Sequence, residues 1–589
     1  MLYGSLSRRE FVIAMLGLAG MATPHSHTRL KNKKPDDYYK LKNFGSIRIL
    51  HITDPHAQLL PVYYREPSIN IGLYNNWGKP PHITGKNFLK FYGIEPKSRY
   101  AYAFTCIDFA KDALKYGKMG GYAHIKYLAD YLRESFGRNK TLFLDGGDTW
   151  QGSATALYSR GQDMVGAQNL LGIDVMTGHW DFTYPEKRII KNIKKLKAEF
   201  LAQNVFVKDE ALLSGAASYD DQGHAFKPYT IKELKGNRIA VIGQAFPYTP
   251  IANPQRFIPD WSFGIHADTL SQLVKDIRMK EKPDAIILLS HNGFDVDKKL
   301  ARIVSGIDFI SGGHTHDGVP EAVPVKNSSG TTYITNAGTN GKFLGVLDIS
   351  IKNHRVDDFR FTLLPVFSDL LPEDKQMRDY IKKVRKPYID ELSKKLVTTE
   401  QLLYRRGNFN GSFDQIICDA LMEVNDAEIA LSPGFRWGTT VIPGKAITVE
   451  DVMNQTAITY PETYTREMKG SVIKAVLEDV ADNLFNRDPF LQQGGDMVRT
   501  GGISYTIAPL KSIGNRISDL RLANGKKIEP DKNYKVTGWA TVKSKAAGEP
   551  IWKTVIKYLD SHKNIANVNV NTPDIVGIKN NPGIDRGCM

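Results

Sequence analysis

Five apolar runs in the first 320 residues each end directly on a motif that contains aspartate or histidine. The runs are IRILHIT, TLFL, IDVMT, DAIILLS and IDFI, and the motifs after them are Asp54-Pro-His56, Gly146-Gly-Asp148, Gly178-His-Trp-Asp181, His291-Asn-Gly293 and Ser311-Gly-Gly-His-Thr-His-Asp317. The runs have the length and composition of buried strands. In α/β proteins the carboxyl ends of successive strands meet at one edge of a sheet, where ligands bind. One such motif is a weak signal, but five in this order predict a site at that edge.

Two of these histidines, His314 and His316, stand one residue apart after a glycine pair. On a continuous strand alternate side chains point the same way, so a turn at the glycines is needed to splay them. That geometry suits two neighbouring metal ions better than one; the alternative is a polar loop with two solvated histidines. Mixed carboxylate and imidazole ligands suit manganese, iron or zinc without selecting among them.

The order of the five motifs resembles that of the calcineurin-like metallophosphoesterases, and within them the 5′-nucleotidase superfamily. The segments HITDPHAQLLPVYYREPSINIG, GHWDFTY and QQGGDMVRTGG look like those of the SoxB thiosulfohydrolases, a branch that acts in bacterial sulfur oxidation. The resemblance covers nearly the whole chain. It implies an α/β fold: a four-layer αββα metallophosphoesterase sandwich followed by a smaller α+β nucleotidase-type C-terminal domain.

The resemblance also implies seven ligands for two divalent metal ions, for which the precedent in this branch is manganese. Matched motif by motif, Asp54, His56 and His316 hold one ion, His179, His291 and His314 hold the other, and Asp148 bridges them. Two ions roughly 3.5–4 Å apart lower the pKa of a shared water and clamp a tetrahedral anionic centre. The implied reaction is in-line hydrolysis of a phosphoryl or sulfuryl group.

The chain departs from the superfamily pattern at Gly178-His179-Trp180-Asp181, where Gly-Asn-His-Glu or Gly-Asn-His-Asp is usual. His179 replaces an asparagine ligand, and Trp180 replaces the histidine that protonates the leaving group. An indole N–H is not acidic at neutral pH, whereas an alkoxide leaving a phosphate ester needs that proton. A thiol has a pKa near ~8.5, so a sulfur group can leave as an anion.

Two alternatives to this interpretation stay open: His179 could itself be the acid, and Trp180 could simply pack in the core. Asp181 is predicted to orient a neighbouring ligand as a carboxylate partner. Three arginines are candidates for substrate contact, because a guanidinium can hold a sulfonate through two hydrogen bonds. They are Arg436 in SPGFR, at the position of the nucleotidases' arginine-bearing loop, Arg499 in QQGGDMVRTGG, and Arg65. For each the alternative is a structural ion pair. An aromatic pair like that with which nucleotidases sandwich a base is not matched.

The predicted organisation has five parts: a twin-arginine-type signal peptide at 1–24, a flexible lead-in at 25–44, a metallophosphoesterase domain at 45–365, a linker helix at 366–400, and a 5′-nucleotidase-like C-terminal domain at 401–589. The first domain carries an insertion at 58–119 rich in Tyr, Pro and Gly, predicted to be ordered and to form a wall of the substrate channel. Amphipathic spacing predicts helices over 122–134 and 186–200.

The amino terminus points to export. Arg8 and Arg9 precede a short apolar segment that closes on small residues, which is typical of a signal peptide and resembles the twin-arginine type; the alternative is a basic helix that stays attached. The predicted location is the periplasm. No apolar run approaches the ~20 residues of a mature membrane anchor.

The net charge and the cysteine content limit the classes of binding partner and the roles that the cysteines can have. The net charge of +15 could favour anionic partners, but no nucleic-acid motif accompanies it, and much of it lies in short solvated lysine runs. Three cysteines do not make a disulfide scaffold. None is assigned to catalysis, and Cys418 has the helical spacing of a buried apolar residue.

Three functions are consistent with the sequence. The resemblance favours hydrolysis of a cysteine S-thiosulfonate on the flexible tail of a SoxYZ-type carrier protein, releasing sulfate in thiosulfate oxidation. A periplasmic 5′-nucleotidase or other phosphoesterase is the alternative, although the insertion and Trp180 speak against it. A non-catalytic binding protein with the same fold would have lost a metal ligand, whereas competent side chains fill all seven positions.

Overall fold

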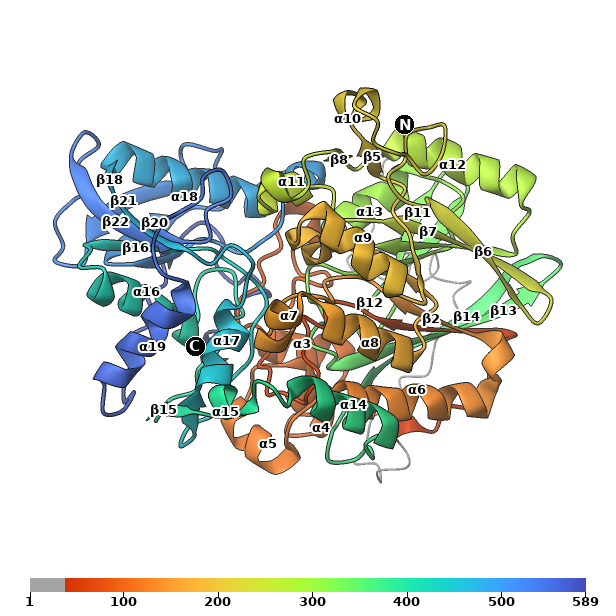
Figure 1. Cartoon of the computed structure of the whole chain (residues 1–589), viewed down its shortest axis with the longest axis horizontal. Helices are drawn as coiled ribbons and strands as arrows, with labels where there is room; N and C mark the ends of the chain where they lie inside the picture. Colours follow the sequence, from red (N-terminus) through yellow and green to blue (C-terminus); the bar gives the residue numbers. More distant parts are fainter. Residues whose placement is uncertain (1–37, 589) are drawn as a thin grey trace, which may run out of the picture.

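Two six-stranded sheets form the first part of the chain in a computed structural model that describes residues 38–588 (Figure 1). The first sheet has the order β14(Arg355–Pro365), β13(Phe343–Lys352), β1(Ile47–Ile52), β2(Thr141–Asp145), β3(Val175–Met176), β4(Glu199–Phe200). The second has the order β11(Val323–Asn327), β12(Gly330–Asn336), β10(Phe309–Gly312), β9(Ala285–Ser290), β7(Asn237–Gln244), β6(Tyr229–Leu234).

The sheets pack face to face because side chains alternate along their strands. In β1, Ile47 and Ile49 join the apolar cluster between the sheets, while Leu50 and Ile52 join the cluster under the outer helices. Helices α6(Tyr122–Phe136), α8(Gln162–Leu171) and α9(Glu186–Lys195) share that outer cluster, and α12(Ala267–Lys280) and α13(Phe294–Ile303) cover the second sheet. The four-layer αββα architecture is confirmed.

The five polar motifs follow β1, β2, β3, β9 and β10. Within the first sheet β1, β2 and β3 are parallel, and within the second β9 and β10 are parallel. The prediction of one sheet edge needs correction, because the motifs come from the edges of both sheets. The site therefore lies across the top of the sandwich.

Two local predictions also change. The helix predicted over 186–200 ends at Lys195, and Glu199–Phe200 forms strand β4 beside β3. Phe200 is buried in the outer core, so tertiary packing overrides the helical spacing. The predicted signal peptide at 1–24 and the lead-in up to residue 37 lie outside the described residues. Within the rest of the lead-in, Tyr39 is buried and donates a hydrogen bond to the Pro365 carbonyl at 3.0 Å, so this part is packed rather than flexible.

Short helices fill the stretches between the main elements. The insertion contains η1(Tyr74–Asn76), α3(Gly85–Tyr92), α4(Arg99–Phe104) and α5(Phe109–Tyr116). Elsewhere the chain forms η2(Arg138–Lys140), α7(Ala154–Ser159), η3(Trp180–Thr183), the pair β5(Val205–Val207) and β8(Trp261–Phe263), α10(Asp209–Leu213), α11(Thr249–Ala252), η4(Gln255–Phe257), α14(Lys375–Arg385) and α15(Ile389–Leu392). The linker region holds α14, which rests on α8 where the Tyr380 hydroxyl donates to the Asp163 carbonyl at 2.7 Å.

The C-terminal part is a smaller α+β unit beside the sandwich (Figure 1). Its main sheet has the order β18(Thr463–Lys469), β22(Asn533–Trp539), β16(Ile429–Ser432), β19(Arg499–Gly501). Smaller sheets are β21(Ile517–Leu522), β20(Ile503–Ile507), β23(Asp574–Ile575) and the pair β15(Lys395–Thr398), β17(Ala446–Thr448). The helices are α16(Ser412–Val424), α17(Val449–Thr456), α18(Gly470–Phe485) and α19(Ile551–Ser561), with η5(Pro489–Leu491) and η6(Arg586–Cys588). Cys418 is a free thiol buried in the core beneath α16, as predicted. No helix among residues 38–588 is long and apolar enough to cross a membrane.

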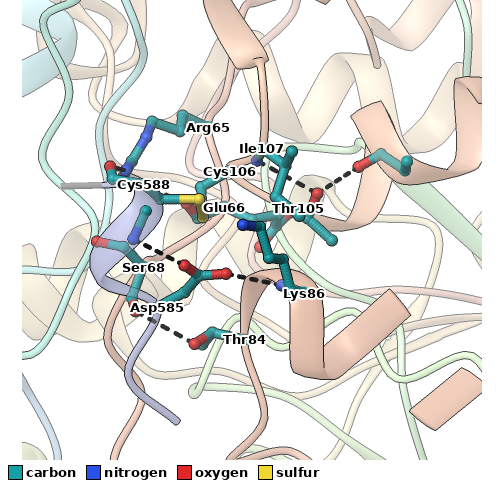
Figure 2. Close-up of a disulfide and its surroundings, with 12 residues drawn as sticks. Arg65, Glu66, Ser68, Thr84, Lys86, Thr105, Cys106, Ile107, Asp585 and Cys588 are labelled. Atoms are coloured by element: carbon teal, nitrogen blue, oxygen red, sulfur yellow. Dashed lines mark hydrogen bonds between the residues drawn. A yellow bond between two sulfur atoms is a disulfide. The ribbon is translucent and has the colours of Figure 1, made fainter. Parts of the chain in front are cut away.

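The end of the chain is tied to the insertion in the first part. Figure 2 shows the Cys106–Cys588 disulfide, which joins residues 482 positions apart and is not predicted from the sequence. Beside it the Lys86 amide donates to the Asp585 carboxylate at 2.7 Å, and the Asp585 amide donates to the Ser68 carbonyl at 2.9 Å. The two parts are therefore held together by a disulfide bond as well as by packing.

Cys588→Ser is expected to lower stability by about 2–4 kcal/mol, because the disulfide restricts the unfolded chain over a long loop. Thermal unfolding of the variant and of the native protein, each with and without reductant, measures this. Reductant should lower the midpoint of the native protein and leave that of the variant unchanged. Equal midpoints for both proteins without reductant would show that the disulfide adds nothing.

Candidate metal centre

Backbone geometry at the strand ends turns the predicted ligands toward one another. Asp54, His56, Asp148, His314 and His316 all have positive φ, between 45° and 72°. Non-glycine residues adopt this conformation at a cost of roughly 1–3 kcal/mol each, and such strain concentrates at functional sites. The positive φ at His314 and His316 provides the turn that was predicted for the two-histidine motif.

Four side chains form a first group in which Asp54, His56, Asp148 and His316 offer ligand atoms within 4.8 Å of one another. The Nε2 atoms of His56 and His316 are 2.9 Å apart, and His316 Nε2 lies 3.3 Å from Asp54 Oδ1. All four residues are buried. This is the set predicted for the first ion, together with the bridging aspartate.

A second group consists of Asp148, His179, His291 and His314, again within 4.8 Å. His179 Nδ1 lies 3.3 Å from Asp148 Oδ1, and His291 Nε2 lies 3.2 Å from Asp148 Oδ2. Asp148 belongs to both groups, which is the position of a bridging ligand. The structure thus brings all seven predicted ligands to one place.

The chemistry of this donor set fits two divalent cations. Among residues 38–588, four buried polar atoms of the two groups make no hydrogen bond, namely Asp148 Oδ2, His179 Nε2, His291 Nε2 and His314 Nε2. Unpaired buried polar atoms are costly, so their clustering within the two ligand groups indicates a site for cations. His291 Nδ1 is 2.6 Å from the Gly146 carbonyl, which fixes the tautomer that turns Nε2 toward Asp148.

Protonation follows from burial and from the shared carboxylates. Burial lowers the pKa of His56 to about 3 and holds the pKa of His314 well below its ordinary value, so both imidazoles are neutral ligands. For His291 burial acts the same way, but Asp148 and Asp54 outweigh it and raise its pKa to about 10. A cation bound here has to displace that proton, so metal binding would release protons.

The Asp181 carboxylate accepts hydrogen bonds from the backbone of the ligand loops and not from a ligand side chain. Its Oδ2 accepts from the amide of Asp148 at 2.9 Å and from that of His179 at 3.3 Å, and its Oδ1 accepts from the Thr149 and Trp150 amides. Burial, followed by the charge of Asp148, raises the pKa of Asp181 to about 7. The predicted orienting role acts through the two ligand loops, and none of these contacts reaches a ligand ring.

Trp180 lies in the wall of a cavity of about 260 Å³ that opens onto the metal centre, which we call the aromatic cavity. Its walls include Asp148, His179, His314, His316, Trp180, Phe246, Phe435 and Trp437. The Trp180 ring meets Phe435 edge-on at 5.1 Å and stacks near Tyr460 at 6.4 Å. Phe246 covers the ligand rings, with its centroid 4.0 Å from that of His179 and 4.2 Å from that of His314.

Arg436 is the one predicted arginine that reaches this cavity. Its Nη2 donates to the Gly495 carbonyl at 2.8 Å, its Nη1 lies 3.5 Å from the His314 carbonyl, and its Nε pairs with Asp496 at 3.2 Å. Although burial raises the pKa of Asp496, the arginines around it hold that pKa below its ordinary value. The guanidinium is therefore anchored by a carboxylate and placed beside a metal ligand.

The predictions for Arg499 and Arg65 need correction. Arg499 has no exposed surface and pairs with Asp414 at 3.0 Å and Asp496 at 3.2 Å, so no substrate can reach it. Arg65 is also buried: its guanidinium lies 4.0 Å over the Tyr404 ring and donates to the Cys588 carbonyl. In both cases the alternative of a structural role holds.

Sequence reasoning missed two residues that shape the centre. Arg406 is buried, donates to the Thr315 carbonyl at 2.7 Å, and lies 3.5 Å from Asp317. Gly494, at φ +80°, passes so close to His314 that a Cβ there would stand 2.1 Å from its Nε2. The segment QQGGDMVRTGG resembles the SoxB branch in sequence, but only the fold reveals that its glycine pair lets the C-terminal part approach His314.

Comparison with known proteins decides the family. The solved structure of the sulfate thiohydrolase SoxB from Thermus thermophilus superposes with a TM-score of 0.84 and 32% sequence identity, covering 92% of this chain and 98% of that one. The chain belongs to the SoxB family. Residues 397–554 also match the family model of the 5′-nucleotidase C-terminal domain.

More distant relatives of this chain are proteins of the 5′-nucleotidase superfamily. UshA from Yersinia enterocolitica is 25% identical over 490 residues, which span 73% of this chain and 82% of UshA. The trifunctional nucleotide phosphoesterase YfkN from Bacillus subtilis is 26% identical over 450 residues, 68% of this chain but only 29% of YfkN. The superfamily consists of metal-dependent hydrolases, in agreement with the two ligand groups.

Proposed function

We propose that this chain hydrolyses an S-thiosulfonate carried on a cysteine of a partner protein, releasing sulfate in thiosulfate oxidation. The observation that carries the proposal is Trp180, which occupies the cavity wall beside the ligands where the superfamily has an acidic histidine. The likeness to the Thermus thermophilus sulfate thiohydrolase supports the same substrate class.

The surrounding histidines offer no substitute for the missing acid among residues 38–588. His179, His314 and His316 border the aromatic cavity, and all three belong to the ligand groups. His82 borders an adjoining cavity, but its Nδ1 is 3.1 Å from Asn70 and its Nε2 is 2.9 Å from Asp295. Both of its ring nitrogens are engaged within the protein, so a leaving group that needs no proton is favoured.

The proposed reaction balances without a protein acid. When bound, two divalent ions, proposed to be manganese, lower the pKa of a shared water and clamp the tetrahedral sulfuryl centre. The water oxygen bonds to the sulfonate sulfur, and the bond between that sulfur and its neighbouring sulfur breaks. The electron pair of the broken bond stays on the neighbouring sulfur, which remains bonded to the cysteine sulfur. The products are sulfate and a cysteine persulfide, and both water protons pass to solvent. Arg436 holds the sulfonate oxygens by charge-assisted hydrogen bonds, and Phe246 shields the ligand rings from water.

The aromatic cavity suits a narrow peptide segment better than a nucleobase. Phe435 stacks on Trp437 at 5.6 Å and meets Trp180 and Trp539 edge-on at 5.1 and 5.5 Å. Its ring already has aromatic neighbours on three sides, so it is poorly placed to sandwich a base. We accordingly propose a SoxYZ-type carrier tail as partner and, with the twin-arginine-like amino terminus, a periplasmic location.

The second candidate is a 5′-nucleotidase or another phosphoesterase, favoured by the similarity to UshA and YfkN at 25–26% identity. It requires the same two-metal centre and an alcohol leaving group. The missing acid and the occupied face of Phe435 count against it.

One competition experiment separates the two candidates. The holoenzyme, reconstituted with manganese, iron or zinc in parallel, is offered a cysteine peptide bearing S-thiosulfonate together with AMP, and sulfate and phosphate are measured by ion chromatography. We expect sulfate with little phosphate, and neither after chelation of the metal. Phosphate without sulfate would select the nucleotidase and refute the proposal.

A further inference from the structure

A second cavity, of about 230 Å³, meets the metal centre from another side. It lies between residues 70–76 of the insertion, helix α13, and residues 483–494 of the C-terminal part. It shares His314, Arg436, Asn483 and Gly494 with the aromatic cavity, so the two openings converge on one ligand. We call it the basic cavity, because its titratable lining is mostly cationic.

The charges of the basic cavity do not cancel. Its lining holds two carboxylates, Asp295 and Asp317, and six cations: Lys298, Lys299, Arg302, Arg406, Arg436 and Arg487. Asp488 and Asp496, from just outside the lining, pair with Lys299 at 2.5 Å and with Arg436 at 3.2 Å. Two positive charges remain in excess even with these two included.

The two uncompensated charges lie at the outer end of the basic cavity. At the inner end Arg406 is buried and lies 3.5 Å from Asp317 and 3.7 Å from Asp496, although its Nε has no hydrogen-bond partner among the described residues. At the outer end Arg302 and Arg487 are exposed, and no carboxylate of the described chain lies within 4 Å of either; Arg487 rests over the Tyr74 ring at 5.3 Å. Cation-lined clefts concentrate anions and guide their movement.

Resting on the proposed function, we propose that the basic cavity binds the tetrahedral oxyanion product and releases it while the carrier segment still fills the aromatic cavity. The persulfide product remains attached to the carrier, whereas sulfate is a free dianion formed beside His314. An outlet separate from the peptide spares the enzyme from withdrawing the carrier before each sulfate leaves. The shared wall at His314 and Arg436 is where the anion would pass from one cavity to the other.

Product inhibition of the holoenzyme tests this. Because sulfate would bind while the peptide is seated, we expect a mixed pattern that excess S-thiosulfonate peptide does not overcome. In the double variant Arg302→Gln/Arg487→Gln the inhibition constant for sulfate should rise about three- to tenfold, as expected for removing two exposed cations. The matched control is Arg355→Gln/Arg466→Gln, which removes the same charge from exposed positions outside both cavities and should leave inhibition unchanged.

A crystal of the holoenzyme soaked in selenate gives a second readout through the anomalous signal of selenium. We expect a peak in the basic cavity beside Arg302 and Arg487, and its loss in the Arg302→Gln/Arg487→Gln variant. Purely competitive inhibition, or equal inhibition constants in the two double variants, would overturn the proposal. A selenate peak accompanied by that kinetic result would mark an adventitious ion only.

Failure of the proposed function can be told apart from failure of this inference. If AMP rather than the S-thiosulfonate peptide is hydrolysed, the product dianion is phosphate, and the same two double variants are compared with phosphate as inhibitor and AMP as substrate. Mixed inhibition weakened only by Arg302→Gln/Arg487→Gln would retain the outlet and discard the thiosulfohydrolase. Sulfate production together with purely competitive inhibition by sulfate would retain the thiosulfohydrolase and discard the outlet.

Discussion

Replacing Asp148 by asparagine is expected to release at least one metal ion and to reduce turnover by about 10³-fold or more. Asp148 is common to both ligand groups, and its carboxylate faces His56, His179 and His291 at 3.2–3.7 Å. Asparagine keeps the shape but removes the negative charge that both cations share. Two-metal sites supply several kcal/mol of transition-state stabilisation, and each 1.36 kcal/mol lost costs tenfold in rate.

Metal content per chain, by mass spectrometry of the purified holoenzyme, and the rate of sulfate release measure this loss together. Asp519→Asn is the control, since Asp519 pairs with Arg521 on the surface at 2.7 Å, and the same change of charge there should alter neither quantity. Circular dichroism verifies that both variants are folded. Two ions per chain and activity within tenfold of the native protein in Asp148→Asn would show that Asp148 does not bridge.

The centre could be predicted from sequence because each of its ligands follows a strand within a few residues. The apolar run of β1 and the glycines next to β2 and β10 place Asp54, Asp148 and His314 at strand ends by local rules, and the family resemblance implied their role as ligands. What those rules could not supply was the pairing of two sheets. The motifs were therefore placed correctly on their strands but assigned to one sheet edge instead of two.

The predictions of substrate contact for Arg499 and Arg65 failed for the opposite reason, since much of the environment of each arginine comes from distant segments. Arg499 is buried by Asp414, 85 positions away, and Arg65 by Tyr404 and the Cys588 carbonyl. A short window around either arginine does not distinguish a buried ion pair from a substrate contact, although Asp496, one partner of Arg499, lies only three positions away. The Cys106–Cys588 disulfide escaped prediction likewise, because spacing says little about a pair 482 positions apart.

Trp180 could be predicted in part from its local motif and in part only from the fold. Its replacement is the sharper test of whether the site lacks a general acid. Its motif was recognisable in sequence, but its place at the cavity wall, with the backbone amide donating to Asp148 Oδ1 at 2.6 Å, comes from the fold. Trp180→His is expected to raise hydrolysis of an alkyl phosphate such as AMP by about tenfold to 10²-fold. A positioned general acid contributes 10²–10⁴-fold, and a newly introduced imidazole, whose position is not optimised, should at best reach the bottom of that range.

The leaving group decides whether a gain of this kind is acid catalysis. An alkoxide needs the proton that histidine supplies, whereas a phenolate from an activated aryl phosphate needs it less, so AMP should gain more than the aryl ester. Trp180→Phe is the matched control, because it removes the same indole from its contacts with Phe435 and Tyr460 without adding an acid. Equal gains for both esters, or for both variants, would indicate that space rather than proton donation had excluded phosphate esters. A gain confined to Trp180→His and to AMP would identify the missing proton donor as the feature that reserves this two-metal centre for a sulfur leaving group.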